Sequence, residues 1–313
     1  MHPVIQSQCR PETEARAAGA PWPWQGCGMI EFLRSPWGEV FEQLVHCARS
    51  SLVISSPYVG REPCDKLVGA ARLGQKAGRF SLLLLTDLSR HVLLTGATDV
   101  SAIADLVAQQ PGAEIRFLPS VHAKIYVADD SVAVVTSANM TTSGLYRNFE
   151  YGVRITSADA VRRIRRDVMA YAALGTQIDE QRLRFLACLS AELNQVRTRA
   201  ESSTRRQLRA EFRRRLKQFD DELLRTRAAG RTAHAIFADA ILYLLAQRPM
   251  RTADLHPLIH KIHPDLCDDA EDRVIDGRHF GKKWKHAVRT AQQHLRRRGL
   301  VQRKGRLWHL VSQ

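Results

Sequence analysis

Short apolar runs alternate with stretches of helical periodicity through the first half of the chain, and this alternation limits the fold more than any other feature. The strand-like runs are β-rich and five or six residues long: 51–55, 80–85, 114–118, 123–128, 132–136 and 150–155. Helical spacing occurs between and after them, at 39–48, 64–77, 103–110 and 158–174. The alternation predicts an α/β fold with a largely parallel or mixed sheet covered by helices. Ligands of such folds gather where strands end, so Ser56, Tyr58 and Asp87 are candidate rim residues.

The two runs on either side of residue 130 predict a β-hairpin that carries four polar residues at fixed offsets. With a two-residue loop at Asp130-Ser131, Lys124 opposes Ser137 and His122 opposes Asn139. All four side chains then lie on one face as a single polar patch. A register shift of one residue would split the patch between the two faces.

Together these four side chains suit a phosphate group. Lys124 supplies a compact positive charge, and Ser137 and Asn139 supply neutral hydrogen bonds. His122 adds an imidazole that can attack phosphorus or move a proton. The patch therefore predicts phosphodiester chemistry.

The spacing of these residues resembles the signature of the phospholipase D superfamily. His122, Lys124 and Asp129 match His-x-Lys-x4-Asp, and Thr136-Ser137-x-Asn139 matches the later Gly-Ser-x-Asn, with Thr in place of the usual Gly. Glu150 matches the glutamate that follows in the nuclease branch. The resemblance covers roughly residues 36–170 and implies a mixed sheet flanked by helices.

The resemblance also implies a mechanism and a partner. In the superfamily two His-Lys pairs share one substrate phosphate: one histidine becomes a phosphohistidine, the other protonates the leaving oxygen, and water completes hydrolysis without a metal or cofactor. This chain holds a single His-x-Lys, at His122. The resemblance therefore implies a homodimer with a shared active site at its two-fold axis.

Each matched residue receives a role from the same resemblance. The non-bridging oxygens of the phosphate would be held by Lys124, Ser137 and Asn139. Glu150 would orient the imidazole and support its cationic form. Asp129, at the turn, would brace the loop.

Charge is divided unevenly along the chain. The formal net charge is +15, yet residues 29–156 hold 12 Lys or Arg against 12 Asp or Glu, so the excess lies after residue 156. We predict four parts: a poorly ordered tail at 1–28, a catalytic domain at 29–175, a basic helical connector at 176–230 and a small separate domain at 231–313. We expect the connector to form two long helices with a break near 202–204, and their apolar stripe to pack on the body or on a second subunit. A neutral catalytic domain joined to a basic half indicates polyanion binding.

Three predicted helices followed by a hairpin over 231–313 resemble a winged-helix DNA-binding domain. Residues 273–306 contain twelve Lys or Arg and one acidic residue, which favours nucleic acid over a protein partner. The predicted third helix presents its polar side chains to a major groove: Lys285, His286, Arg289, Thr290, Gln292 and Gln293. Lys304 and Arg306 lie on the wing, where contacts to phosphate are expected.

A rival constellation in this region is His256, His260, His263 and Cys267, whose spacing is that of a zinc site. Pro257 and Pro264 interrupt the helix that would carry it, and we predict no metal site.

These observations predict a homodimeric, metal-independent DNA endonuclease, with a role in restriction or phage defence. The alternatives are a nuclease acting on RNA, an enzyme acting on phospholipid, and a DNA-binding regulator with a non-catalytic module. The absence of an apolar run long enough for a membrane span, the lack of a signal-peptide core and six scattered cysteines indicate a cytoplasmic protein.

Overall fold

The computed structural model describes residues 30–74, 80–201, 206–228, 230–275 and 278–311. The tail predicted at 1–28 and the helix break predicted at 202–204 lie outside these residues.

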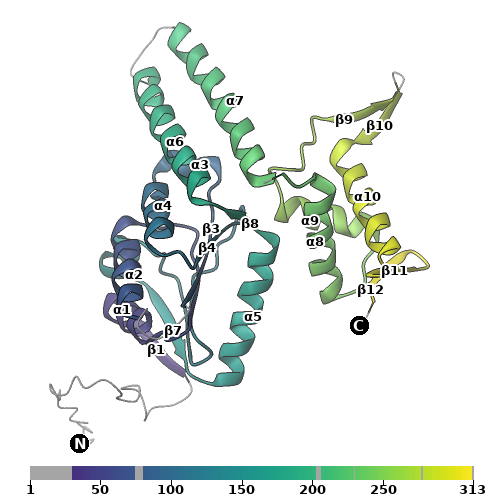
Figure 1. Cartoon of the computed structure of the whole chain (residues 1–313). Helices are drawn as coiled ribbons and strands as arrows, with labels where there is room; N and C mark the ends of the chain where they lie inside the picture. Colours follow the sequence, from purple (N-terminus) through teal and green to yellow (C-terminus); the bar gives the residue numbers. More distant parts are fainter. Residues whose placement is uncertain (1–29, 75–79, 202–205, 229, 276–277, 312–313) are drawn as a thin grey trace, which may run out of the picture.

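Eight strands form one mixed sheet at the centre of the larger part of the molecule (Figure 1). They are β1 (Ile30–Arg34), β2 (Ser51–Ser55), β3 (Ser81–Thr86), β4 (Ala113–Phe117), β5 (Ile125–Ala128), β6 (Val132–Thr136), β7 (Tyr151–Ile155) and β8 (Thr176–Ile178). Their order across the sheet is β1-β7-β6-β5-β2-β3-β4-β8. Strands β2, β3 and β4 pair in parallel, and the remaining neighbours pair antiparallel. The predicted α/β fold with a mixed sheet is confirmed.

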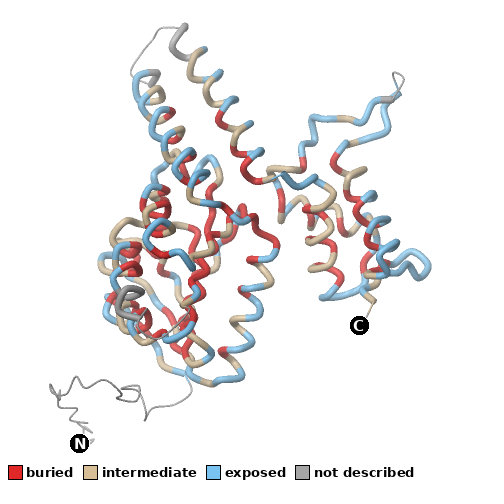
Figure 2. The backbone as a smooth tube through the Cα atoms, viewed as in Figure 1, coloured by how far each residue is buried: buried red, intermediate tan, exposed pale blue. Residues whose placement is uncertain are grey.

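Helices cover both faces of this sheet. One face carries α1 (Gly38–Cys47), α2 (Arg61–Gly74), α3 (Arg90–Thr95) and α4 (Val100–Gln109), and the other carries α5 (Ala158–Leu174). Alternate strand residues serve the two faces: Leu52 and Ile54 join the core under α1, α2 and α4, whereas Val53 joins the core under α5. Figure 2 shows the buried residues along the strands and on the inner sides of the helices.

Strands β1 and β8 and helix α3 were not predicted. Strand β1 is at the edge of the sheet and leaves Ile30 and Phe32 exposed, and β8 is three residues long. Both are defined by pairing with strands far away in sequence, β7 and β4. Local periodicity cannot reveal an element of this kind.

The connector forms two long helices, α6 (Glu180–Glu201) and α7 (Arg206–Ala228), which Figure 1 shows as a hairpin rising from the body. Their apolar stripe includes Leu186, Leu193 and Phe219, all part of the core on the α4 side. Of the two predicted alternatives for this stripe, the described structure shows packing on the body.

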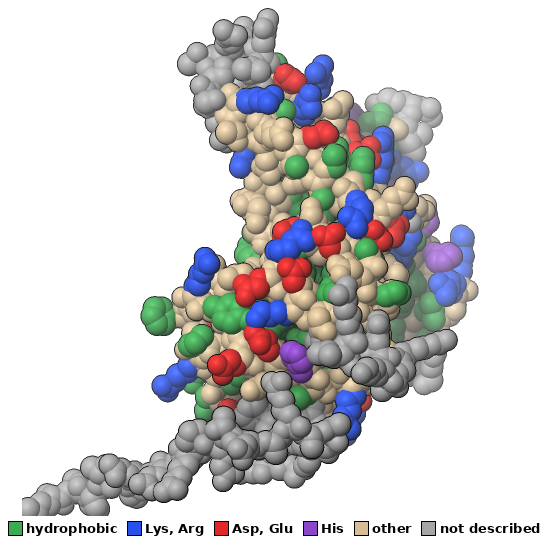
Figure 3. All heavy atoms as spheres, turned by 60° about the vertical axis from the view of Figure 1, so that its left-hand side comes forward, with side chains coloured by type: hydrophobic (Ala, Val, Ile, Leu, Met, Phe, Trp, Pro, Cys, Tyr) green, Lys and Arg blue, Asp and Glu red, His purple; other side chains and the backbone are tan. Residues whose placement is uncertain are grey.

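Figure 3 views the molecule from the side of these helices, and basic and acidic side chains are interspersed over the body. This mixture agrees with the zero net charge counted for residues 29–156. Within the described residues, no helix has the length and apolar character that a membrane span requires.

The C-terminal part contains the three predicted helices, α8 (Ala233–Gln247), α9 (Thr252–Ile262) and α10 (Lys283–Arg297), and then the hairpin of β11 (Val301–Lys304) and β12 (Leu307–Leu310). A bridge between Met250 and Trp308 ties this hairpin to the start of α9. A second hairpin, β9 (Asp272–Ile275) and β10 (Arg278–Lys282), precedes α10 and was not predicted. Its apolar residues Val274 and Phe280 are exposed, so it lacks the half-buried alternation by which a strand is recognised.

One hydrophobic cluster joins the C-terminal helices to the sheet. It runs from Val127 of β5 through Val168 of α5 to Phe237 and Ile241 of α8 and Val288 of α10. The C-terminal part therefore packs directly against α5 and shares a core with the sheet.

Arg227, at the end of α7, lies at the junction of the three parts and is 1% exposed. Its guanidinium donates to Nδ1 of His263 (2.8 Å), hydrogen bonds with Thr176, and lies 3.6 Å from a carboxylate oxygen of Asp265. Burial, with the nearby guanidinium, lowers the pKa of His263 to about 3, so the ring is neutral and can accept this bond. The arginine thereby links the connector, strand β8 and the segment after α9.

Candidate active site

Polar side chains collect at one end of the strands, where β2, β3, β4 and β6 end and β5 and β7 begin. His122 and Lys124 lie just before β5, and Ser137 and Asn139 lie just after β6. Glu150 immediately precedes β7. Three neighbouring strands, β5, β6 and β7, thus bring the predicted catalytic residues to the same end of the sheet.

The hairpin register differs from the prediction by one residue. Ala128 pairs with Val132, so the loop holds three residues, and the carbonyl of Lys124 accepts from the amide of Thr136 (3.1 Å). The prediction that Lys124 opposes Ser137 is wrong. His122, Ser137 and Asn139 lie beyond the ladder, where strict alternation no longer applies, and they remain at the same end of the strands.

Asp129 explains the longer loop. Its backbone adopts a positive φ of 50°, and its carboxylate accepts from the amides of Arg49, Ser50 and Ser51 at 2.8–2.9 Å and from the Ser50 hydroxyl at 2.8 Å. Burial alone would raise the pKa of Asp129, but these donors hold it below its usual value. Asp129 thus anchors the hairpin to β2, at the end of the strands opposite His122.

His122 and Lys124 form the centre of the site. The imidazole is exposed, whereas Lys124 is 8% exposed. The ammonium nitrogen lies 3.3 Å from Nδ1 and 3.2 Å from Nε2 of His122, and it donates to the His122 carbonyl at 2.9 Å. Burial lowers the pKa of Lys124, and the charge of Glu150 opposes this shift. A buried cation is therefore held directly beside an imidazole that solvent can reach.

Glu150 contacts Ser137 and Asn148 instead of the histidine. The Ser137 hydroxyl donates to one carboxylate oxygen, and Nδ2 of Asn148 donates to the other at 3.2 Å. Ser137 also accepts from the amide of Tyr151 at 3.1 Å. The hydrogen bond from His122 to Glu150 that the resemblance implied does not occur among the described residues. Glu150 acts on the site through Ser137 and through the charge of Lys124.

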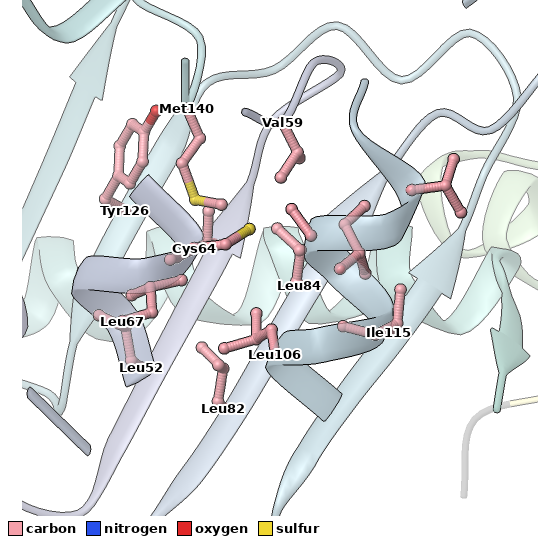
Figure 4. Packing of buried hydrophobic residues seen from close by; sticks show 14 of the residues in the cluster. Leu52, Val59, Cys64, Leu67, Leu82, Leu84, Leu106, Ile115, Tyr126 and Met140 are labelled. Atoms are coloured by element: carbon pink, nitrogen blue, oxygen red, sulfur yellow. The ribbon is translucent and has the colours of Figure 1, made fainter. Parts of the chain in front are cut away.

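Asn139 carries a polar atom without a partner. Its Oδ1 is buried and accepts no hydrogen bond within the described structure. The backbone of Asn139 packs directly against Gly144: a Cβ on Gly144 would lie only 2.3 Å from the Asn139 carbonyl oxygen, so no larger residue fits there. The next residue, Met140, donates its amide to the Ser56 hydroxyl at 2.8 Å and packs near Tyr126 (Figure 4). A buried, unpaired amide oxygen can accept a hydrogen bond from a ligand group that carries a proton.

Thr136, the departure from the usual Gly, has a visible consequence. It pairs with Gly152 on β7, and a Cβ on Gly152 would lie 2.7 Å from the Thr136 Cβ. The Thr136 hydroxyl donates to the Tyr151 carbonyl (3.1 Å) and accepts from the Ala138 amide (3.2 Å). The threonine therefore shapes the segment that carries Ser137 and Asn139, and Gly152 makes room for it. Sequence reasoning missed Gly144, Asn148 and Gly152, which carry no recognisable local signal.

Of the three predicted rim residues, Ser56 and Asp87 support the site from beneath. Asp87 is 3% exposed and accepts from the amides of Ser89 (2.8 Å) and Ser120 (3.1 Å). Ser120 has a positive φ of 60° and lies two residues before His122. Asp87 thereby fixes the loop that delivers the histidine. The carbonyl of Tyr58 accepts from the Ser56 hydroxyl at 2.7 Å.

The predicted DNA-binding residues lie on α10 and on the β11–β12 hairpin. His286, Arg289, Thr290 and Gln293 line a cavity of about 420 Å³, together with His234, Arg273, His294 and Arg297. Lys285 lies over the ring of Trp284 (5.4 Å). Lys304 and Arg306 are exposed at the hairpin tip. The placement of Gln292 in the groove is wrong, because it is 1% exposed and hydrogen bonds with Thr252.

The four residues of the rival zinc constellation are buried or make contacts with other side chains. His256 and His260 lie against the ring of Trp284, at 5.5 and 5.8 Å between centroids, and His263 accepts from Arg227. Cys267 is buried. Among the described residues, no three His, Cys, Asp or Glu side chains are grouped as metal ligands.

Residues 41–170 match the family model described as "Cardiolipin synthase, PLD-like domain". This stretch, which is less than half of the chain, is similar to a phospholipase D-like domain. It contains the His122, Lys124, Ser137, Asn139 and Glu150 cluster and ends inside α5. No curated protein matches the chain in sequence.

Three solved structures are similar to about half of this chain. Nuc, a phospholipase D family member from Salmonella typhimurium, is 16% identical with a TM-score of 0.41, covering 48% of this chain and 97% of Nuc. NucT from Helicobacter pylori is 13% identical with a TM-score of 0.37, covering 45% of this chain and 92% of NucT. TrmBL2, an archaeal chromatin protein, is 12% identical with a TM-score of 0.36, covering 48% of this chain and 54% of TrmBL2.

Proposed function

We propose that the protein is a phosphodiesterase that cleaves DNA through a phosphohistidine on His122, without a metal or cofactor. The observation that carries this proposal is the exposed imidazole of His122 beside the buried ammonium of Lys124. A fixed cation at this position stabilises negative charge on a phosphate that the imidazole attacks.

The reaction has two displacement steps. A ring nitrogen of His122 attacks phosphorus, the bond to the leaving oxygen breaks, and the second histidine of the site protonates that oxygen. Water then attacks the phosphohistidine, loses its proton to the second histidine and releases the phosphate monoester. Lys124 and the Nδ2 group of Asn139 donate to the non-bridging oxygens and stabilise them in both transition states. The Ser137 hydroxyl, which donates to Glu150 in this structure, joins them when its proton turns to the phosphate. Glu150 keeps Ser137 oriented and favours the charged form of Lys124.

A second copy of the chain supplies the second histidine, since one chain contains one His-x-Lys. An exposed apolar surface beside Glu150 supports this part of the proposal. Phe32 is 68% exposed, Tyr151 is 54% exposed with its ring 6.3 Å from that of Phe32, and Phe149 is fully exposed. Large exposed apolar side chains grouped in this way are typical of protein interfaces. Sedimentation of wild type as a dimer and of Phe149→Asp as a monomer would support it, whereas a monomeric wild type would contradict it.

DNA is proposed as the substrate because of the basic C-terminal part. Arg289, Gln293 and Arg297 follow one exposed face of α10, and Arg273 of β9 borders the same cavity. A basic helix face of this kind supplies phosphate contacts and reads base edges. The enzyme would thereby bind duplex DNA with one part and cut with another, which suits a restriction or phage-defence role.

The decisive experiment incubates purified protein with plasmid DNA and with RNA in excess EDTA. We expect DNA nicking by wild type and by the control His46→Ala, whose exposed imidazole lies on α1 far from the site. His122→Ala should bind DNA normally without cutting it. Cutting by His122→Ala at the wild-type rate would reject the assignment.

The same experiment separates the two alternatives. Preferential cleavage of RNA would change the substrate but keep the site. Tight DNA binding without nicking by wild type would favour the non-catalytic regulator, which the basic face of α10 also supports.

A further inference from the structure

A cavity of about 560 Å³ lies between the catalytic loop and the C-terminal helices. The loop 118–123 forms one side and contributes His122 itself. Tyr171 of α5, Tyr243 of α8 and Lys261 of α9 contribute the other side. The exposed imidazole therefore borders the cavity, and anything bound there lies next to the scissile phosphate.

The chemistry of the lining is specific. The rings of Tyr171 and Tyr243 are 6.0 Å apart at their centroids and inclined by 58°, and both are half-buried. The rest of the wall is largely apolar, with Leu118 and Ile262 among its residues. Lys261 is exposed and has no carboxylate partner within the described chain. Flat aromatic walls with one unpaired cation, beside a phosphate-attacking group, match a base and its adjacent phosphate.

The size of the cavity restricts the ligand further. Its volume falls in the usual range of small-ligand pockets, about 300–1,000 Å³, and accommodates one nucleotide. A base pair within a stacked duplex cannot enter a space of this size, so the nucleotide must be unpaired or turned out of the helix.

We propose that this cavity is a subsite for the nucleotide next to the scissile phosphate, with its base against Tyr171 and Tyr243 and a neighbouring phosphate on Lys261. The inference rests on the proposed function and deepens it. The C-terminal part then completes the active site, and the nucleotide next to the cleaved phosphate is unpaired, either in a single strand or where it is turned out of a bound duplex.

Lys261→Met tests the phosphate contact, with Lys217→Met as the matched control. Lys217 is an exposed lysine on α7 that does not line the cavity. Binding of a fluorescent single-stranded oligonucleotide is measured by anisotropy at several salt concentrations. We expect Lys261→Met to weaken binding and to lower the slope of log K against log salt by about 0.7, the value for one phosphate contact on a single strand. The control should leave both unchanged.

The base contact is tested on wild-type protein with an oligonucleotide that lacks one base, the abasic position being moved along the strand. Loss of the base in the cavity should weaken binding by about 5- to 150-fold, which corresponds to the usual worth of one stacked base. Positions outside the cavity should have smaller effects. Equal binding by Lys261→Met and Lys217→Met, together with no position-dependent abasic effect, would overturn the subsite.

Hydrolysis of bis(p-nitrophenyl) phosphate separates this proposal from the proposed function. This small diester needs the catalytic residues but not the subsite. The control Lys217→Met should hydrolyse it at the wild-type rate, whereas Lys261→Met should show a raised KM for the oligonucleotide. If wild type hydrolyses neither substrate but the binding effects remain, the subsite stands and the catalytic proposal fails.

Discussion

Replacement of Asp129 by Asn should destabilise the protein without impairing the chemistry of the folded enzyme. The carboxylate accepts four hydrogen bonds, three on Oδ1 and one on Oδ2. An amide can keep the three bonds on its oxygen, but they lose their ionic character, and its NH2 group then faces the amide of Arg49. Hydrogen bonds to a charged acceptor contribute about 1.5–3 kcal/mol each and neutral ones about 0.5–1.5. Allowing for partial exposure, we expect a loss of about 2–4 kcal/mol.

Urea unfolding at pH 7 measures this loss, and Asp130→Asn is the matched control. Asp130 is exposed, and its carboxylate lies 3.7 Å from Arg165, a contact expected to contribute under 1 kcal/mol. Because the pKa of Asp129 is lowered by folding, its contribution is full above its unfolded pKa of about 3.9 and disappears as the pH falls through the folded value. The difference between wild type and Asp129→Asn should therefore shrink in acid. Equal stability of the two Asn variants at pH 7, or a catalytic defect in fully folded Asp129→Asn, would refute the anchoring role.

Three other perturbations address the active site and the DNA-binding face. Gly152→Ala should lower the free energy of unfolding by about 1–3 kcal/mol, because the new Cβ crowds Thr136. Adding Thr136→Gly to the same chain should restore part of this loss, and a double variant whose loss is the sum of the two single losses would contradict the crowding. Glu150→Gln should lower the pKa of Lys124 further, so the alkaline limb of the pH–rate profile should move to lower pH. An alkaline limb that does not move would show that the charge of Glu150 does not act on Lys124. Arg289→Ala should weaken duplex binding and reduce its salt slope by about 0.9, while bis(p-nitrophenyl) phosphate hydrolysis stays unchanged.

We propose two roles for the C-terminal part, binding DNA and forming one wall of the cavity at His122, and both follow from where it packs. The basic face of α10 is exposed, whereas Tyr243 of α8 and Lys261 of α9 border the cavity next to His122. The buried guanidinium of Arg227 and the shared hydrophobic cluster fix this arrangement. A truncation after α5 would remove part of the cavity wall as well as the proposed DNA-binding face.

The sequence by itself determined the α/β class and most strand and helix positions, because periodicity is a local property, as in the continuous apolar run at 80–85. It also predicted a candidate site from the spacing of His122, Lys124, Ser137, Asn139 and Glu150. The basic C-terminal helix was readable for the same reason.

Only the tertiary structure decided the hairpin register, the partner of Glu150 and the cavity beside His122. The register depends on hydrogen bonds from Asp129 to Arg49, Ser50 and Ser51, almost eighty residues away in sequence. The cavity depends on how α8 and α9 dock against α5. Contacts between segments so far apart are set by packing in three dimensions, and no local pattern in the chain encodes them.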